Sequence, residues 1–168
     1  FTALGVSLDT LVPPKKGHER QQPSSSRAAA PLMGPKDLPV HGAAEGGKGA
    51  IIVTTDPIDY VARPHPLLNV RDAYGIIVVE DSMTPEFEPG DIALVHPHLP
   101  PAIGVTCVFY AEQRDGTMQA LIKRLRRIST DAWHVRQWNP RDGEKSDLVL
   151  KKEEWQTCHV TVGRYSRR

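Results

Sequence analysis

The pattern that most restricts the fold of this chain is a succession of short apolar runs, separated by turn residues, from residue 73 onward. The runs read AYGIIVVE, DIALVHP, GVTCVFYAE, MQALIKRLRRI, DAWHVRQWN and TCHVTVGRYS. Pro89-Gly90 is typical of a type II turn, and Asp115-Gly116 is typical of a hairpin turn. Because hardly any run has a helical period, each is predicted to be a strand. We therefore expect a mainly β domain of short antiparallel strands.

The part before residue 73 changes composition along its length. Residues 13–36 are polar, interrupted by prolines and poor in large apolar side chains. Such a segment buries too little surface to offset its conformational entropy, so we expect a flexible linker. Residues 37–72 contain a Gly/Ala-rich stretch that can lie extended, followed by the predicted strand AIIVTT. The expected organisation is an N-terminal segment at 1–12, a linker at 13–36, an extended region at 37–72 and the β domain at 73–168.

Charge and composition exclude several classes of function. A formal net charge of +1 gives no general attraction to nucleic acid. No apolar run reaches membrane-spanning length and no signal peptide opens the chain, so we expect a cytoplasmic protein without membrane contact. Cys107 and Cys158 lie in apolar alternating runs and are predicted to be small buried hydrophobes. His96 and His98 predict a surface turn, and we expect neither a metal nor a cofactor.

Two residues carry the candidate chemistry. Ser82 follows an apolar run in VVEDSMTPEFEPGD, where a serine alone is ordinary turn chemistry. In the run MQALIKRLRRI, strand alternation puts Lys123 on the same face as Leu121 and Leu125. If that face packs inward, desolvation lowers the pKa of the lysine from about 10.4, and a neutral lysine is a general base. A lysine that snorkels to water is the ordinary alternative, but a serine and an inward lysine together match the Ser–Lys variant of serine catalysis.

These residues resemble a known family. EDSMTPEFEPGD, followed by IKRL with Lys123 at 123 − 82 = 41 residues after Ser82, resembles the LexA-like peptidase domain of self-cleaving repressors. The resemblance covers roughly residues 37–165 and implies the β-rich fold shared by LexA and signal peptidases. It also includes an Asn-Pro turn at Asn139-Pro140 and departs from the family at Glu80, where glycine is common.

The resemblance implies a role for each matched position. Ser82 falls on the nucleophile and Lys123 on the general base. The backbone N–H groups of Asp81 and Ser82 fall where the family stabilises the oxyanion. The supporting motif positions are Met83, Gly90 and Asp91.

The family's substrate is its own chain, cut at a bond between small residues upstream of the serine. Gly46 stands 82 − 46 = 36 residues before Ser82, so the resemblance implies cleavage of the Gly46-Gly47 bond. Only small residues let an extended strand lie close to a nucleophile. Ala43-Ala44 is the alternative bond, because Gly46 replaces the usual Ala or Cys. A Gly-rich connection that is never cut also stays open.

The beginning of the chain carries a second, shorter resemblance. FTALGVSLDTLV is similar to the closing helix of the helix-turn-helix domain of phage repressors. Residues 1–12 are therefore expected to be the C-terminal remnant of a DNA-binding domain. The implied protein is a bacterial or prophage repressor that forms a homodimer and binds operator DNA through that domain. The implied releasing partner is the activated RecA filament of the SOS response or an antirepressor protein.

Other classes of function fit the chain less well. A signal peptidase shares the serine and GD motifs but needs a membrane anchor and a membrane-facing surface. A Ser-His-Asp hydrolase lacks the GxSxG motif here, and nothing selects one of the seven histidines as its partner. The serious alternative is a catalytically silent dimerisation and sensing domain of a repressor, released by an antirepressor or a ligand.

Overall fold

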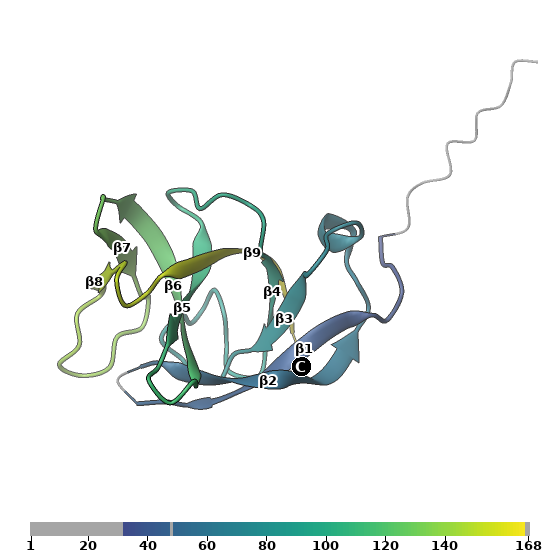
Figure 1. The fold of residues 1–168 in the computed structure, drawn as a ribbon, viewed down its shortest axis with the longest axis horizontal. Coiled ribbons are helices and arrows are strands. Elements are labelled where there is room, and N and C mark those ends of the chain that lie inside the picture. The colour runs from purple at the N-terminus through teal and green to yellow at the C-terminus, as the bar shows by residue number, and fades with distance from the viewer. Residues whose placement is uncertain (1–31, 48, 167–168) are drawn as a thin grey trace, which may run out of the picture. The chain divides into compact units, whose positions relative to one another are not determined.

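The computed structural model describes residues 32–47 and 49–166, which form nine strands and one short 3-10 helix without an α-helix (Figure 1). The expectation of a mainly β fold of short strands is confirmed. No helix among these residues has the length and apolar character needed to cross a membrane. The elements are β1 (Leu38–Glu45), β2 (Ile51–Val61), η2 (His65–Leu67), β3 (Tyr74–Ile77), β4 (Ile92–His96), β5 (Thr106–Glu112), β6 (Met118–Ile128), β7 (Ala132–Arg136), β8 (Asp147–Lys151) and β9 (Thr157–Tyr165).

The strands form one sheet in the order β2-β1-β3-β4-β9-β5-β6-β7-β8. An additional pairing between β2 and β6 closes seven of them into a circuit, and β7 and β8 extend beyond β6 (Figure 1). Only the β1–β3 pair is parallel among the pairs of described strands. Closure satisfies backbone groups that would otherwise remain unpaired at a sheet edge.

Strand β6 changes partner along its length. One edge pairs with β5, while on the other edge residues 118–120 pair with β2 and residues 124–128 pair with β7. Residues 121–123 therefore lie where the second edge passes from one partner to the next. This opening lets other segments of the chain reach the middle of β6.

Most strands lie where the apolar runs predicted them, and the differences have local causes. The run AYGIIVVE is a strand only from Tyr74 to Ile77, because the chain then turns toward Ser82. Strand β8 was not predicted, since only Leu150 among its five residues is buried and no alternation marks it. The two predicted turns are present, and Gly90 and Gly116 have the positive φ values of 92° and 83° that favour glycine.

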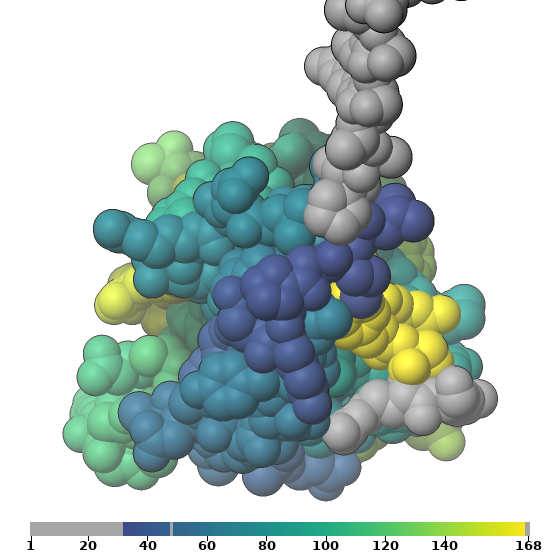
Figure 2. Space-filling model, turned by 90° about the vertical axis from the view of Figure 1, so that its right-hand side faces the viewer, coloured from purple at the N-terminus to yellow at the C-terminus, as the bar shows by residue number. Residues whose placement is uncertain are grey.

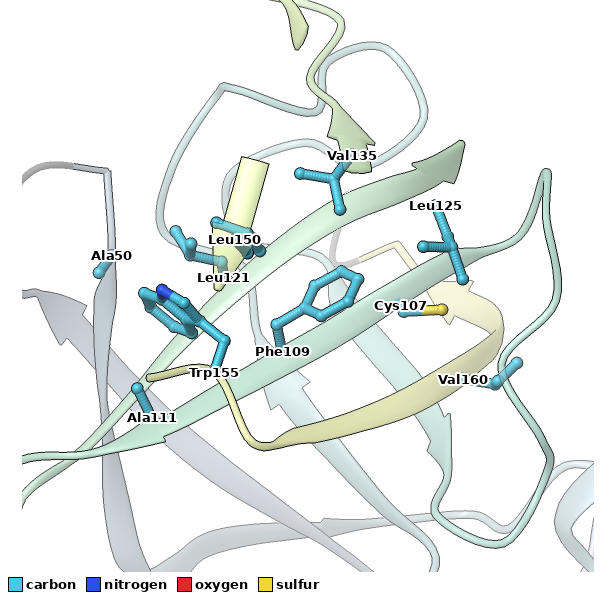
Figure 3. Close-up of a cluster of buried hydrophobic side chains, with 10 residues drawn as sticks. All are labelled: Ala50, Cys107, Phe109, Ala111, Leu121, Leu125, Val135, Leu150, Trp155 and Val160. Carbon is cyan, nitrogen blue, oxygen red and sulfur yellow. The ribbon is translucent and has the colours of Figure 1, made fainter. Parts of the chain in front are cut away.

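Two of the three core clusters lie on the two faces of β6, and the third packs between β1, η2 and β4. Leu121 and Leu125 belong to one cluster with Phe109 and Trp155 (Figure 3), whereas Ala120 and Ile122 belong to another. Cys107 is fully buried in the first cluster, and Cys158 packs against it. The first cluster also holds Ala50, which comes from the connection between β1 and β2 and fixes the tip of that hairpin to the domain (Figure 3).

The start of β1 lies next to the end of β9. Figure 2 shows the beginning of the described chain in purple beside the C-terminal strand in yellow. The hydroxyl of Tyr165 donates a 2.7 Å hydrogen bond to the carbonyl of Ala62 there. Residues 32–36, at the end of the predicted linker, also bond with the domain through Gly34 N–H to Arg63 O at 2.6 Å and Arg63 N–H to Pro35 O at 2.9 Å. Residues 1–12 and most of the linker lie outside the described residues.

Candidate active site

Ser82 lies in a tight turn that its neighbour Met83 anchors to the core. Met83 is 1% exposed and packs with Phe87 in the cluster beneath the turn. The N–H of Thr84 donates to Asp81 O at 2.9 Å, and the N–H of Phe87 donates to Met83 O at 3.0 Å. The buried methionine and these turn bonds fix the backbone on both sides of a half-buried serine.

The loop between β7 and β8 also holds this turn. The backbone N–H groups of Trp138 and Asn139 both donate to Ser82 O, at 3.0 and 2.9 Å. The Asn139 side chain donates to Asp81 O at 3.2 Å, and the Trp138 indole donates to Glu86 Oε2 at 2.7 Å. The sequence marked Asn139-Pro140 only as a turn, so this contact was missed. A hydrogen bond between two loops produces no regular spacing of residue types, so the sequence does not reveal it.

Lys123 meets Ser82 in the interior. It is 2% exposed, and its ammonium Nζ donates to Ser82 Oγ over 2.8 Å. Burial lowers the pKa of Lys123 to about 8, against smaller opposite contributions from Glu80 and Glu144. The face shared by Leu121, Lys123 and Leu125 packs inward, because all three side chains are buried.

Glu80 adds a carboxylate beside the pair. It lines one small pocket together with Ser82, Met83 and Lys123. Burial raises the pKa of Glu80 above its usual value, while Lys123 and Arg141 act in the opposite direction. A negative charge at this position favours the protonated form of Lys123, which the glycine common in the resembling family would not do.

Gly90 and Asp91 support the turn through a buried carboxylate. Asp91 is 2% exposed, accepts a 2.9 Å hydrogen bond from the Glu88 N–H and pairs with the guanidinium of Arg164 on β9. The N–H of Gly90 donates to Val78 O at 2.7 Å. These bonds join both ends of the Ser82 loop to β4 and β9, so the motif has a structural function.

Asp91→Asn is expected to lower the free energy of unfolding by about 1–3 kcal/mol, because the Glu88 N–H and the Arg164 guanidinium lose their charged, buried acceptor. Urea unfolding of the two proteins measures the change. Asp147→Asn is the control, because the ion pair of Asp147 with Arg136 is exposed and its loss should barely move the midpoint. Equal effects of both substitutions would contradict a special role for Asp91.

The backbone donors assigned to the oxyanion are available. Within the described residues, the N–H groups of Asp81 and Ser82 donate to no other group. Free N–H groups beside a serine hydroxyl are the arrangement that stabilises the negative oxygen of a tetrahedral intermediate. Their role remains a prediction.

The predicted scissile bonds lie in the β1–β2 hairpin, whose tip reaches the pair. Gly49, with a φ of 73°, lines the pocket of Ser82 and Lys123. Gly46 and Gly47 lie in the turn, where Gly46 N–H donates to Ala50 O at 2.7 Å and Ala50 N–H donates to Gly47 O at 3.0 Å. Ala43-Ala44 is paired with β2. The structure therefore brings the hairpin tip to the Ser82–Lys123 pair. Among the described residues, however, no residue of either predicted scissile bond lines the pocket of Ser82.

Two comparisons with known proteins show which family the chain belongs to and which repressor it is similar to. Residues 39–161 match the family described as Peptidase S24-like. Over 70 residues the chain is 44% identical to Repressor protein C of Rhizobium phage 16-3, a match that covers 41% of this chain and 27% of that protein. The chain thus aligns with about a quarter of the length of this relative. The two matches confirm the resemblance to the LexA-like domains of repressors. Because the family match covers well over half of the 168 residues, the chain belongs to the Peptidase S24-like family.

Proposed function

We propose that this chain is the C-terminal regulatory part of a transcriptional repressor and that Ser82 and Lys123 cut its own β1–β2 hairpin. The single observation that carries the proposal is the 2.8 Å contact between Lys123 Nζ and Ser82 Oγ at a lysine that is 2% exposed. Burying a lysine lowers the stability of the fold, because its charge must be removed from water. A catalytic use would explain why the chain carries a lysine at this position. The family membership and the similarity to a phage repressor support the same function.

The mechanism follows from the groups present. Neutral Lys123 takes the hydroxyl proton of Ser82, and Ser82 Oγ attacks the carbonyl carbon of Gly46. The N–H groups of Asp81 and Ser82 stabilise the negative carbonyl oxygen. Protonated Lys123 then gives its proton to the nitrogen of Gly47, the C–N bond breaks, and an ester joins Ser82 to Gly46. A water molecule deprotonated by Lys123 hydrolyses this ester and restores the serine.

The hairpin has to rearrange before the attack. Its present turn is closed by the hydrogen bonds between Gly46 and Ala50 and between Gly47 and Ala50. Opening these bonds allows the Gly46 carbonyl to move toward Ser82, while Ala50 remains the nearby anchor in the core. Because the substrate is part of the same chain, its effective concentration at the serine is high once the hairpin has moved.

Cleavage would switch repression off by a loss of avidity. A dimeric repressor binds two half-sites of its operator, and the second contact is intramolecular once the first has formed. In the proposed protein, cutting at Gly46 separates a DNA-binding domain at the N-terminus from a dimerising domain at the C-terminus. The proposed partners are a second copy of the chain, operator DNA and a releasing factor, either the activated RecA filament or an antirepressor.

Mass spectrometry of the purified chain after incubation at alkaline pH tests the proposal. Cleavage at the predicted bond yields fragments of residues 1–46 and 47–168, and the alternative bond yields 1–43 and 44–168. Both pairs differ in mass, so one experiment identifies the bond. A chain that remains intact over days at every pH in the presence of the releasing factor contradicts self-cleavage.

The rate of cleavage should rise with pH. Because burial lowers the pKa of Lys123 to about 8, the lysine is mostly protonated at pH 7 and mostly neutral at pH 9. Only the neutral form accepts the serine proton, so the rate should increase about tenfold over this interval and then level off. Time courses by gel electrophoresis at fixed ionic strength measure it. A rate that is flat from pH 6 to pH 10 contradicts a titrating lysine.

A second candidate function is a catalytically silent dimerisation and sensing domain. One observation favours it, namely that the turn around Gly46 and Gly47 is closed and, among the described residues, neither glycine lines the pocket of Ser82. In that case a ligand or an antirepressor would release the operator without any cut. An intact chain that still dimerises in analytical ultracentrifugation is the result expected for this alternative.

A further inference from the structure

A second cavity lies between the β1–β2 hairpin and the β5–β6 hairpin, which meet where β2 pairs with β6 (Figure 1). Its volume is about 590 Å³, within the range of roughly 300–1,000 Å³ that is typical of small-molecule sites. Strands β1, β2, β3, β5, β6 and β9 all contribute to its walls. Among the described residues, it shares no wall residue with the pocket of Ser82 and Lys123.

Four aromatic rings line this cavity, those of His41, Tyr74, Tyr110 and His159. Their centroids are 5.9 Å apart for His41 and Tyr74, 6.5 Å for Tyr74 and Tyr110, and 5.4 Å for Tyr110 and His159. None of these ring pairs is stacked face to face, so the rings do not fully cover one another. The mechanism proposed for Ser82 uses none of them.

Three of the four rings, those of Tyr74, Tyr110 and His159, bond to each other through their polar ends. The Tyr74 hydroxyl bonds both the Tyr110 hydroxyl and His159 Nδ1, the latter over 2.8 Å. Burial raises the pKa of both tyrosines and lowers the pKa of His159, with His98 adding to the latter effect. Both phenols and this imidazole are therefore neutral at pH 7. Their π faces remain as the electron-rich surface of the cavity.

The one acidic group of the wall, among the residues that the structure describes, is Asp115 in the turn between β5 and β6. Its carboxylate accepts from the side chain and the backbone N–H of Thr117, at 2.7 and 2.9 Å, and these bonds lower the pKa of Asp115. None of the described residues that line the cavity is a lysine or an arginine. An anionic ligand would thus meet a carboxylate without a counter-charge, whereas a cation would meet a carboxylate and aromatic faces.

The rim supplies apolar surface. Ile52 and Met118 line the cavity and are each 37% exposed. They offer contact to an alkyl or aryl group beside the charged centre of a ligand.

We propose that this cavity binds a small organic cation, a quaternary or protonated amine that carries an apolar group. The proposal does not depend on self-cleavage. His41 and residues 52–55 belong to the hairpin that carries Gly46 and Gly47, so the bound cation contacts the element that rearranges in the proposed reaction.

The decisive experiment compares choline with its uncharged carbon isostere, 3,3-dimethylbutan-1-ol, in calorimetric or NMR titrations of the full chain. The two probes have the same shape, but only choline carries the positive charge that aromatic faces and a carboxylate attract. Choline should therefore bind at least about tenfold more tightly than the isostere. Equal affinity for the two probes overturns the proposal, and so does an absence of choline binding up to about 10 mM, where the binding free energy is already very small.

Variants locate the site. Asp115→Asn keeps an acceptor for the Thr117 N–H and should weaken choline binding several-fold, without an effect on the isostere. Asp142→Asn, in an exposed turn outside the cavity wall, is the matched control and should change neither affinity. Tyr110→Phe keeps the ring and should retain most of the affinity, whereas Tyr110→Leu should lose it. If Tyr110→Leu does not fold, Asp115→Asn decides, because unchanged choline affinity in that variant also overturns the proposal.

Discussion

Ser82→Ala is expected to slow self-cleavage at least about a thousandfold, to the level of the uncatalysed reaction on the experimental time scale. Alanine removes only the Oγ that lies 2.8 Å from Lys123 Nζ. The turn itself is held by backbone bonds to Ser82 O and by the buried Met83, so the fold should not change. Quantitative mass spectrometry of the fragments at pH 9 measures the loss.

Lys123→Arg should have an equally large effect for a different reason. Arginine stays protonated at every accessible pH and therefore cannot accept the serine proton. Ser166→Ala and Lys151→Met are matched controls, because both side chains are exposed and neither lines the pocket of Ser82. Cleavage by Lys123→Arg at the rate of the unchanged protein would show that another group acts as the base.

Lys123→Met is expected to raise the free energy of unfolding at pH 7, although it should abolish the proposed cleavage. Burial lowers the pKa of Lys123 from 10.5 to about 8, and a difference of this size corresponds to a penalty of up to about 3 kcal/mol for the protonated form. Methionine has a similar length and no charge to desolvate. We therefore expect a gain of about 1–3 kcal/mol, reduced by the lost hydrogen bond to Ser82.

The pH dependence gives this prediction its sign. Below pH 8 the lysine is protonated in both the folded and the unfolded chain, so the folded protein carries the full penalty. Between pH 8 and 10.5 the unfolded chain binds more protons than the folded chain, and the stability of the unchanged protein therefore rises with pH.

Guanidinium unfolding of both proteins at pH 7 and near pH 10 measures the effect. The advantage of Lys123→Met should be large at pH 7 and mostly gone near pH 10. Lys151→Met, at an exposed position, should show no such difference. If Lys123→Met is less stable than the unchanged protein at pH 7, the lysine is a stabilising element and not a residue retained for chemistry.

The strands and the candidate pair followed from local patterns. Alternation along residues 118–128 was sufficient to put Lys123 on the face of Leu121 and Leu125, because side chains of a strand point to opposite faces in turn. Strand β8 has only one buried side chain, so its apolar and polar residues do not alternate. Its sequence therefore does not predict a strand. The Asn139 contact with Asp81 was also invisible, since it joins two loops 58 residues apart.

The position of the scissile bond stays a prediction, because a count along the chain does not fix which residue lies beside Ser82. Gly46 stands at the separation from Ser82 that the family implies, yet Gly49 is the glycine beside the pair. Strand β1 has two register irregularities, around His41, and each changes how far the chain advances along its partner. Such irregularities depend on packing against β2 and β3, so no count of residues reveals them.

The sequence by itself determined which residues become most of the strands, which face of β6 is apolar and that a lysine lies on that face. These properties depend on side-chain spacing over a few residues, which local sterics and burial fix. The tertiary structure alone decided that β6 exchanges β2 for β7 beside Lys123, that Asn139 holds the serine turn and that four rings from different strands line one cavity. The pairing of β6 with β2 and the cavity come from the closing of seven strands into one circuit, where strand register is a collective property of all the pairings. Asn139 lies outside that circuit, in the connection between β7 and β8, and its contact with the serine turn depends on how β7 pairs with β6.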